Sequence, residues 1–283
     1  MRFKLLILTL LIAFKGFATH NRAGYISYTW VGGNTYKFRI YTYTNPTSYQ
    51  ADKCEETIIF TDITQNGHDI ELVCPRVNSN PTDLVGINLA YCPQGSGGQG
   101  QGFILVNPYP SIYNHTYGGV KVNIYEGTYT FNGASSAYVF GMVDPNLDSN
   151  VNNVGGGNSQ NVAFALLDTL RIGNFSGNNN TPLVSNPPID NVCWHQPFCY
   201  NPGMADDNHD SLSYSLISFT TGDTNGVFYN ASGSFIPQGI SVNPITGDLC
   251  WTAQYNNFAD QQLGEYDIDM LIKEYRRNPI DGR

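Results

Sequence analysis

The residues best suited to chemistry lie in one acidic stretch, GMADDNHDSLSYSL, at residues 203–216. Asp206, Asn208 and Asp210 occupy alternate positions there, directly before a strand-like run. Calcium is a hard cation that takes about six to eight oxygen ligands, and one turn with this spacing offers several of them. We therefore predict a calcium site at these three residues. The alternative is a hydrated Asx-type turn that starts a strand.

An EF-hand is excluded, because its sixth position is Ser211 rather than Gly and its twelfth is Ile217 rather than Glu. The sequence also shows no specific set of catalytic residues. A glycosidase needs two carboxylates about 5 to 9.5 Å apart, and no particular pair stands out. Cys193 and His195 share a strand face only in a regular segment, and an exported cysteine is normally oxidised. We predict a non-catalytic protein, with a secreted hydrolase as the second alternative.

Aromatic side chains are abundant, with 19 Tyr, 15 Phe and 3 Trp. Exposed aromatic rings stack on sugars and on partner proteins. A carbohydrate-binding module is therefore the first alternative function, with a sugar surface formed by Tyr41, Tyr43, Tyr109 and Tyr113. The competing interpretation is that alternate aromatic residues fill the core of a β-sandwich.

The first 18 residues have the composition of a secretory signal peptide. Arg2 and Lys4 supply its charge, residues 5–14 form an apolar run, and residues 16–18 form a small-x-small cleavage site. A membrane-spanning helix needs about 20 apolar residues, about twice this run. We predict a secreted or outer-surface protein that is cleaved near Ala18 and has no membrane span in its mature part.

The charge balance limits the partners. The chain has 14 Lys+Arg against 23 Asp+Glu, a formal net charge of -9 and no basic run. This balance disfavours nucleic acid and anionic lipid as partners. We expect other surface proteins or extracellular glycans instead.

Six cysteines in an exported chain favour disulfides over a zinc site, since neither C-x-x-C nor the usual His spacing is present. Six cysteines allow 15 pairings. Three lie in each half of the chain, so either one bridge crosses between the halves or unpaired thiols remain. The cysteines are Cys54, Cys74, Cys92, Cys193, Cys199 and Cys250.

Short alternating segments with Gly and Asn turns predict an all-β chain. Residues 23–44 have the pattern of a hairpin around Gly32-Gly33-Asn34, with Tyr36, Phe38 and Ile40 on one face. Further strands are expected at residues 56–63, 68–73, 102–106, 120–131 around Glu126 and Gly127, 136–143 and 161–172. Two low-complexity pieces interrupt them: residues 95–102, where we expect a flexible loop, and the Asn/Gly-rich run 148–158.

The second half alternates as well. Leu212, Tyr214 and Leu216 point one way in residues 211–219. In residues 264–275, the inward set is Tyr266, Ile268, Met270 and Ile272, while Asp267, Asp269 and Lys273 point outward. A turn at residues 243–248 leads into Leu249-Cys250-Trp251. Residues 177–188 have linker composition, and we place a domain boundary near Val184. This pattern fits an immunoglobulin-like sandwich.

Several segments resemble the N-terminal region of gliding-motility-associated surface proteins that carry a C-terminal sorting domain. They are THNRAGYISYTW, YEGTYTFNGASSAYVFGMVDPN, PPIDNVCWHQPFCYNPGMADDNHDSLSYSLI, ISVNPITGDLCWTA and GEYDIDMLIKEYR. The second half is similar to immunoglobulin/cadherin-like modules with an Asp-Pro-Asp-Gly-Asp-Ser-Leu-like loop, matched at residues 206–212. His209 stands where that loop usually has Gly, and Asp207 where it has Pro.

The resemblance implies an adhesion or scaffold role and secretion by the type IX system. It also implies that distant segments complete the calcium site. The candidates are Asp190, Asn191, Asp267, Asp269 and Glu274. Our expected organisation is a signal peptide at residues 1–18, a β-sandwich domain at 19–184, and an immunoglobulin/cadherin-like sandwich at 185–283. We expect the second sandwich to lack its last strand, which leaves one edge unpaired.

Overall fold

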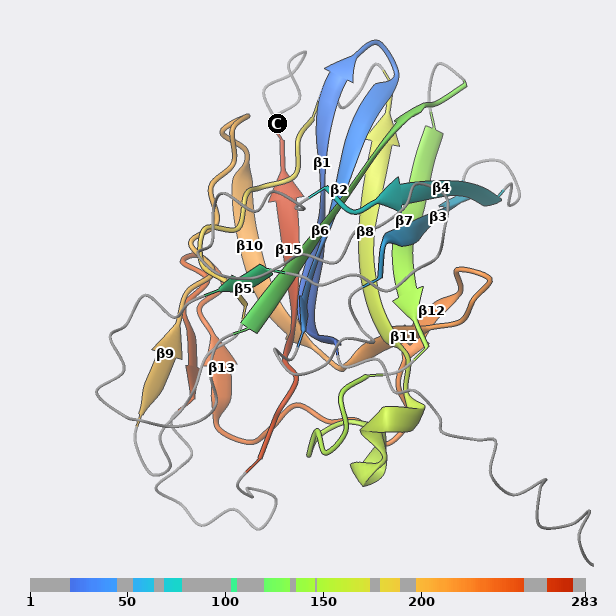
Figure 1. The fold of residues 1–283 in the computed structure, drawn as a ribbon. Helices are drawn as coiled ribbons and strands as arrows, with labels where there is room; N and C mark the ends of the chain where they lie inside the picture. The colour runs from blue at the N-terminus through green and yellow to red at the C-terminus, as the bar shows by residue number, and fades with distance from the viewer. Residues whose placement is uncertain are drawn as a thin grey trace, which may run out of the picture.

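A computed structural model describes residues 21–44, 53–63, 69–77, 103–105, 120–132, 136–145, 147–173, 179–188, 197–251 and 264–276. Nearly all of its regular structure is β, as the sequence predicts (Figure 1). Two short 3-10 helices, η1 (Gly155–Gly157) and η2 (Ser159–Asn161), are the exceptions within these ranges. Neither they nor any other helix in the described ranges could cross a membrane.

The first half is a sandwich of two antiparallel four-stranded sheets. Sheet I has the order β1-β2-β6-β5 and sheet II the order β4-β3-β7-β8. The strands of sheet I are β1 (Asn21–Gly32), β2 (Thr35–Thr44), β5 (Phe103–Leu105) and β6 (Val120–Thr130). Those of sheet II are β3 (Glu55–Asp62), β4 (Asp69–Pro75), β7 (Ser136–Asp144) and β8 (Phe164–Ile172).

Aromatic rings fill the space between the two sheets. Tyr36, Phe38 and Ile40 are fully buried, which confirms the face that alternation assigned to them. Phe38 of sheet I meets Phe60 of sheet II edge-on, with ring centroids 4.9 Å apart, and Phe140 at 5.3 Å. Such pairs stabilise a core by about 0.5 to 1.5 kcal/mol each beyond the burial of their area. The alternate aromatics therefore form the core of this sandwich.

β6 runs through Glu126 and Gly127 without a turn, in agreement with the strand expected at residues 120–131. β6 pairs with β2 throughout, and Gly127 stands opposite Phe38. A Cβ atom at Gly127 would come within 2.7 Å of the Cys74 Sγ atom. Glycine in a strand interior marks either a bend or a close approach of another chain segment. Here it permits β4 to approach β6.

The second half consists of shorter ladders. β10 (Ser211–Ile217) pairs with β15 (Asp269–Tyr275), and β11 (Thr220–Gly222) pairs with β12 (Phe228–Asn230). β14 (Leu249–Trp251) lies between β13 (Ile240–Val242) and β9 (Phe198–Tyr200). The turn at 243–248 is confirmed, because Asn243 Oδ1 accepts hydrogen bonds from the N–H groups of Ile245 and Thr246.

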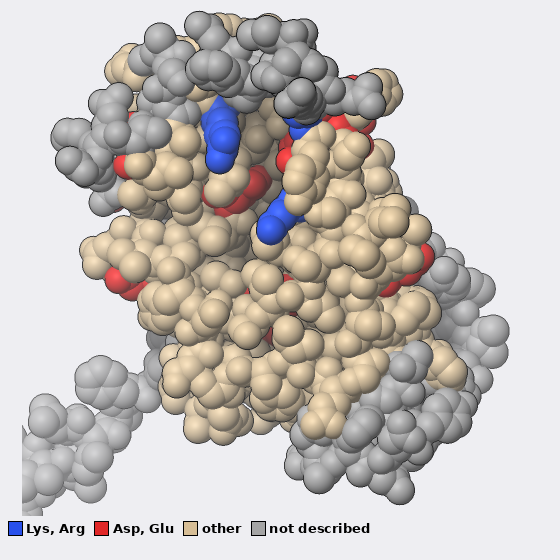
Figure 2. Space-filling model, turned by 180° about the vertical axis from the view of Figure 1, so that it is seen from behind, with Lys and Arg blue, Asp and Glu red and all other residues tan. Residues whose placement is uncertain are grey.

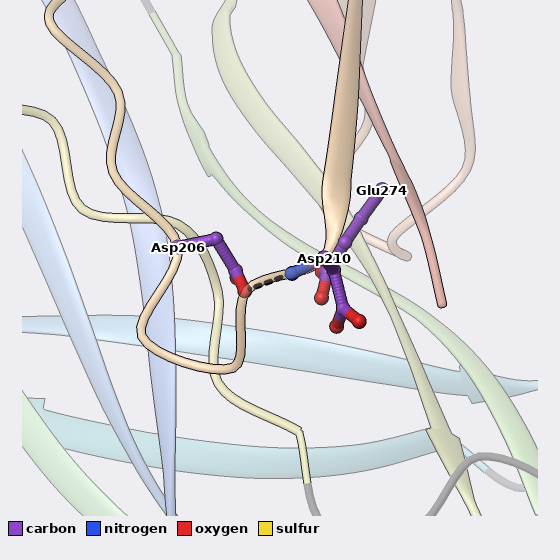
Figure 3. A group of neighbouring side chains, drawn as sticks. All are labelled: Asp206, Asp210 and Glu274. Carbon is purple, nitrogen blue, oxygen red and sulfur yellow. Dashed lines mark hydrogen bonds between the residues drawn. The ribbon is translucent and has the colours of Figure 1, made fainter. Parts of the chain in front are cut away.

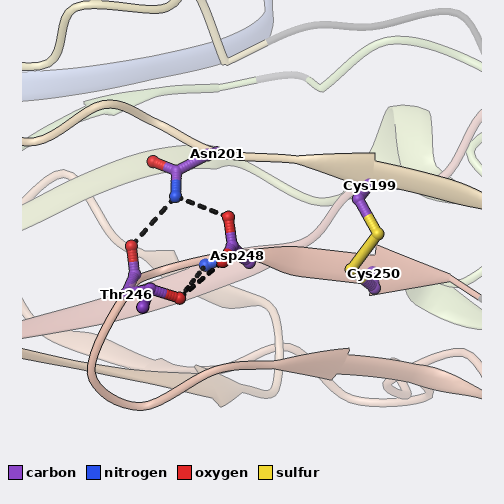
Figure 4. The surroundings of a disulfide bond; sticks show 5 residues. All are labelled: Cys199, Asn201, Thr246, Asp248 and Cys250. Carbon is purple, nitrogen blue, oxygen red and sulfur yellow. Dashed lines mark hydrogen bonds between the residues drawn. A yellow bond between two sulfur atoms is a disulfide. The ribbon is translucent and has the colours of Figure 1, made fainter.

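A disulfide joins β9 and β14 at Cys199 and Cys250, which stand opposite each other in the ladder (Figure 4). Beside it, Asn201 Nδ2 donates 2.7 Å to Asp248 Oδ1 and 2.9 Å to the carbonyl of Thr246. Cys54 is disulfide-bonded as well, and Cys74 is a free, buried thiol. An unpaired thiol therefore remains, which is one of the two outcomes that the sequence allowed.

The Asn/Gly-rich run 148–158 is an ordered junction between the halves. Asn153 is 1% exposed; its Nδ2 atom donates 2.7 Å to the carbonyl of Asp267 and 3.0 Å to that of Phe235. Its Oδ1 atom accepts 3.0 Å from the N–H of Asp267. From composition alone, a solvated polar loop cannot be distinguished from a loop whose Asn side chains hydrogen-bond to a neighbouring backbone. The other low-complexity piece, residues 95–102, lies outside the described residues.

Candidate functional site

The acidic loop, residues 203–210, leads directly into β10. Asp206 Oδ1 accepts a hydrogen bond of 2.8 Å from the N–H of Asp210, and the Asp206 carbonyl accepts one of 3.2 Å from the N–H of His209. His209 has a φ angle of 62°, in the left-handed region that most side chains avoid and that His tolerates better. The loop is therefore an Asx-type turn that starts a strand, with His in the conformation that glycine usually takes.

Three carboxylates converge beside this turn (Figure 3). One oxygen atom each of Asp206, Asp210 and Glu274 lies within 4.8 Å of the other two. Antiparallel pairing sets Glu274 of β15 opposite Leu212 of β10, and this register brings its side chain to the loop. We call these three residues the carboxylate cluster. Two of its members come from the predicted calcium site and the third from the distant candidates.

The other predicted ligands lie elsewhere. Asn208 Oδ1 accepts 3.0 Å from the N–H of Asn180, so this amide faces the connecting segment rather than the cluster. Asp269 Oδ2 accepts 2.6 Å from the N–H of Thr220, and Asp267 faces the acidic side chains of Asp269 and Glu265. Both are partly buried, although alternation placed them outward. Two further candidates lie outside the described residues: Asp190 and Asn191.

Arg276 supplies a positive charge to the cluster. Its Nε atom donates 2.9 Å to Asp210 Oδ2, and its NH2 atom lies 2.8 Å from the same oxygen. The NH2 group also donates 2.6 Å to Asn179 Oδ1 in the connecting segment. Planar guanidinium groups match carboxylates in this forked geometry. The sequence analysis did not select Arg276, yet pairing β10 with residues 264–275 would have placed it beside Asp210.

The two neighbouring carboxyl groups differ in acidity. Burial raises the pKa of Asp210, but hydrogen bonds with Glu274 and Arg276 and the guanidinium charge outweigh it, so this pKa lies below the usual value. Burial, with the hydrogen bond to Asp210, raises the pKa of Glu274 to about 8. Glu274 thus keeps its proton at neutral pH and shares it with Asp210.

Two oxygen atoms of the cluster are buried without a hydrogen-bond partner among the described residues: Asp206 Oδ2 and Glu274 Oε1. Buried polar atoms are normally paired, and an orphaned oxygen often marks the place of an ion or a water. Carboxylate oxygens are ligands that calcium prefers. The donor set therefore fits a calcium ion at Asp206 and Glu274, while Asp210 is already bound by Arg276.

The cluster lies where the two halves are joined. Residues 179–183 form the connecting segment, which runs along the edge of β1 and then along the acidic loop. The N–H of Thr181 donates 3.0 Å to the carbonyl of Tyr28, and Leu183 exchanges backbone hydrogen bonds with Ala205. Arg276 holds the same segment through Asn179. An ion bound here would therefore stiffen the connection between the halves.

The sites of the alternative functions are less well supported. Tyr43 is buried, and Tyr41 is half-buried and stacked on Tyr25 with ring centroids 4.4 Å apart. Tyr43 is therefore not exposed to a sugar, and one face of the Tyr41 ring is covered by Tyr25. The remaining residues of these two candidate sites lie outside the described residues: Tyr109, Tyr113, Cys193 and His195.

Comparisons with known proteins add no name to this geometry. No family model, no curated protein and no solved structure matches the chain.

Proposed function

We propose that this chain is an exported, non-catalytic scaffold or adhesion module of the gliding-motility-associated type, which binds calcium at the carboxylate cluster. The main support is that the carboxylates of Asp206, Asp210 and Glu274 converge where the connecting segment joins the two halves. A cation at such a place stiffens a module without any chemistry on a substrate. The immunoglobulin/cadherin-like nature of the second half belongs to this proposal.

The disulfides favour an oxidising, extracytoplasmic setting. Cys199 and Cys250 are bonded, and Cys54 is bonded too. Disulfides persist outside the reducing cytosol, which agrees with the signal peptide at residues 1–18. Display on the cell surface or release from it is the setting in which such a module holds other surface proteins or glycans.

The proton of Glu274 and the charge of Arg276 both oppose calcium binding at the cluster. Asp206 and Glu274 hold the ion in this proposal, so Glu274 has to release its proton when calcium binds. Arg276 already neutralises Asp210 and repels a second cation nearby. Affinity should therefore be modest, and it should rise when the guanidinium charge is removed.

Thermal unfolding with millimolar calcium or with chelator tests the proposal. A ligand that binds only the folded chain stabilises it, by about 2.7 kcal/mol at a hundredfold excess over Kd. We expect calcium to raise the unfolding midpoint of the wild type, Asp206→Asn to abolish the rise, and Arg276→Gln to lower the calcium concentration needed for it.

Asp223→Asn is the matched control, because Asp223 lies in a turn outside the cluster and caps the N–H groups of Asn225 and Val227. Its calcium response should equal that of the wild type. An unchanged wild-type midpoint at millimolar calcium would refute calcium binding. A calcium response that persists in Asp206→Asn would show that calcium binds elsewhere, and a response lost equally in Asp206→Asn and Asp223→Asn would contradict a specific role of the cluster.

A further inference from the structure

A cavity of about 1210 Å³ lies between the two halves. Pockets for small molecules usually measure about 300 to 1,000 Å³. Three strands contribute consecutive residues to its lining: 22–26 from β1, 164–169 from β8, and 264–276, which include β15. A strand that presents a face contributes every second residue. The consecutive lining therefore means that these strands turn their backbone edges toward the cavity.

The outer edge of β15 has backbone groups that no described strand pairs with. The N–H of Tyr214 in β10 donates 3.1 Å to the carbonyl of Pro244, so it points away from β15. Its ladder partner, Ile272, therefore belongs to a pair without hydrogen bonds between the two residues. By alternation the N–H and C=O groups of Met270 and Ile272 point to the outer side of β15. Among the described strands, none pairs with that side.

β1 and β8 end their sheets in the same region. Each is the outermost described strand of its sheet, β1 in sheet I and β8 in sheet II. The connecting segment already binds the β1 edge, because Thr181 donates to the Tyr28 carbonyl and receives the N–H of Tyr28 on its hydroxyl. An extended chain thus fits along one border of the cavity.

The cavity wall is apolar with a negative centre. Ile240, Leu249, Trp251, Met270 and Ile272 line it, and all five are only half-buried. The hydrophobic residues of the second half have therefore not closed a core of their own. An extended peptide with apolar side chains at alternate positions would cover them.

Carboxylates face the same space, and Arg22, which also lines it, is already paired with Glu265 and Asp148. Asp267 Oδ2 is buried and has no hydrogen-bond partner among the described residues. Burial and the charges of Asp269 and Glu265 hold the pKa of Asp267 well above its usual value, and burial raises the pKa of Asp168 to about 7. From behind, acidic and basic side chains surround a hollow between two parts of the surface (Figure 2). A basic side chain at the acidic centre would relieve this repulsion.

We propose that the cavity is an acceptor for an extended strand of a second polypeptide, which pairs with the free edge of β15 and places a Lys or Arg beside Asp267. Strand addition gives affinity through main-chain hydrogen bonds and specificity through alternate side chains. The inference rests on the scaffold role proposed above, since it names the kind of partner that the scaffold holds. The acceptor edge corresponds in length to the seven residues of β15.

Three synthetic peptides test the proposal on the purified chain, with binding measured by titration calorimetry in the presence of a chelator. The first is a seven-residue peptide in which valine, lysine and valine alternate with threonine. The second has glutamate in place of lysine, and the third has every backbone amide methylated. We expect the lysine peptide to bind, the glutamate peptide to bind about tenfold more weakly or worse, and the methylated peptide not to bind.

Two variants locate the binding. Ile272→Pro removes an N–H group that points away from β10 and leaves the hydrogen bonds between β10 and β15 intact. It should therefore lower the affinity for the lysine peptide about tenfold. Asp267→Asn keeps the shape of the side chain and should reduce the preference for lysine over glutamate severalfold. If Ile272→Pro fails to fold, Asp267→Asn decides the question.

The proposal is overturned if the lysine peptide does not bind. It is also overturned if all three peptides bind equally, because equal binding indicates an apolar surface without strand pairing. An unchanged lysine preference in Asp267→Asn also overturns it. The chelator keeps this test separate from the calcium test. If the peptides do not bind, the proposal of a calcium-binding scaffold is unaffected. If calcium does not raise the unfolding midpoint, the proposal of a strand acceptor is unaffected.

Discussion

At the scale of single residues, a proton and a guanidinium compensate the charges of the carboxylate cluster, for which we propose calcium as a further ligand. Glu274 shares a proton with Asp210, which Arg276 holds in its charged form. Like charges this close cannot all ionise without a counter-charge. The cluster should therefore respond to pH as well as to calcium.

Glu274→Gln should reduce the loss of stability on going from pH 5 to pH 9. The pKa of Glu274 is about 8 in the folded chain and about 4.3 in an unfolded one. Between these values the folded state binds more protons, so the free energy of unfolding falls as pH rises. Glutamine keeps the neutral form at every pH. We expect the unfolding midpoint of the variant to exceed that of the wild type increasingly from pH 5 upward, measured in chelator.

Asp207→Asn is the control for this experiment. Asp207 is exposed in the same loop but lies outside the cluster, so the substitution removes a carboxylate without touching the cluster. Its pH profile should follow the wild type. A parallel profile for Glu274→Gln would show that Glu274 does not hold its proton in the folded chain.

At the scale of elements, hydrogen bonds of irregular segments join the two halves of the chain. The run 148–158 shows this most clearly, since Asn153 binds the backbone of Asp267 on both sides, as a strand would. A side-chain amide has one acceptor and two donors and can therefore imitate a peptide group. The same run also reaches β12's neighbourhood, where the N–H of Gly156 donates to the carbonyl of Gly233.

Asn153→Ala should lower the free energy of unfolding by about 3 kcal/mol, because it leaves the part-buried N–H and C=O groups of Asp267 and the carbonyl of Phe235 without their partner. Denaturant titration measures the effect. Asn161→Ala is the matched control, since Asn161 is exposed in η2, and it should stay within about 0.5 kcal/mol of the wild type. Equal effects of the two substitutions would contradict the role of Asn153 as a fastening between the halves.

At the scale of the whole molecule, the two halves are unequally packed. The first half has a continuous aromatic core to which Phe219 and Ala231 of the second half also belong. Outside that cluster, Tyr214 is the one buried hydrophobic residue of the described second half. A module with so little core of its own depends on its neighbours, its disulfide and whatever occupies the cavity.

Export should be required for the oxidised fold. Deletion of residues 2–18 should retain the chain in the cytosol with reduced Cys199 and Cys250, since the cytosol keeps thiols reduced. The intact chain should be accessible to protease added outside whole cells, and thiol labelling after denaturation should find both cysteines blocked. Equal labelling of the two forms, or resistance of the intact chain to external protease, would contradict export.

The strand pattern was readable from the sequence wherever side chains alternate between a core and another environment. The hairpin at residues 23–44 and the buried faces of β2 and β10 follow from a period of two, because a one-residue slip would expose Phe38 or Tyr214. Asp206 and Asp210 were predictable as neighbours because they stand four positions apart in one turn. The role of Gly127 was not readable, because its close approach to Cys74 depends on how β4 packs against β6.

The sequence by itself determined the all-β class, the hairpins and the acidic turn, since these depend on neighbouring residues and on local backbone preferences. Tertiary structure alone decided that Glu274 joins Asp206 and Asp210, that Arg276 neutralises the group, and that Asp267 faces a cavity rather than solvent. These outcomes depend on which strand pairs with which and on how the halves are fastened. Register and docking arise from the summed burial of many distant residues, and no short stretch of sequence contains that sum.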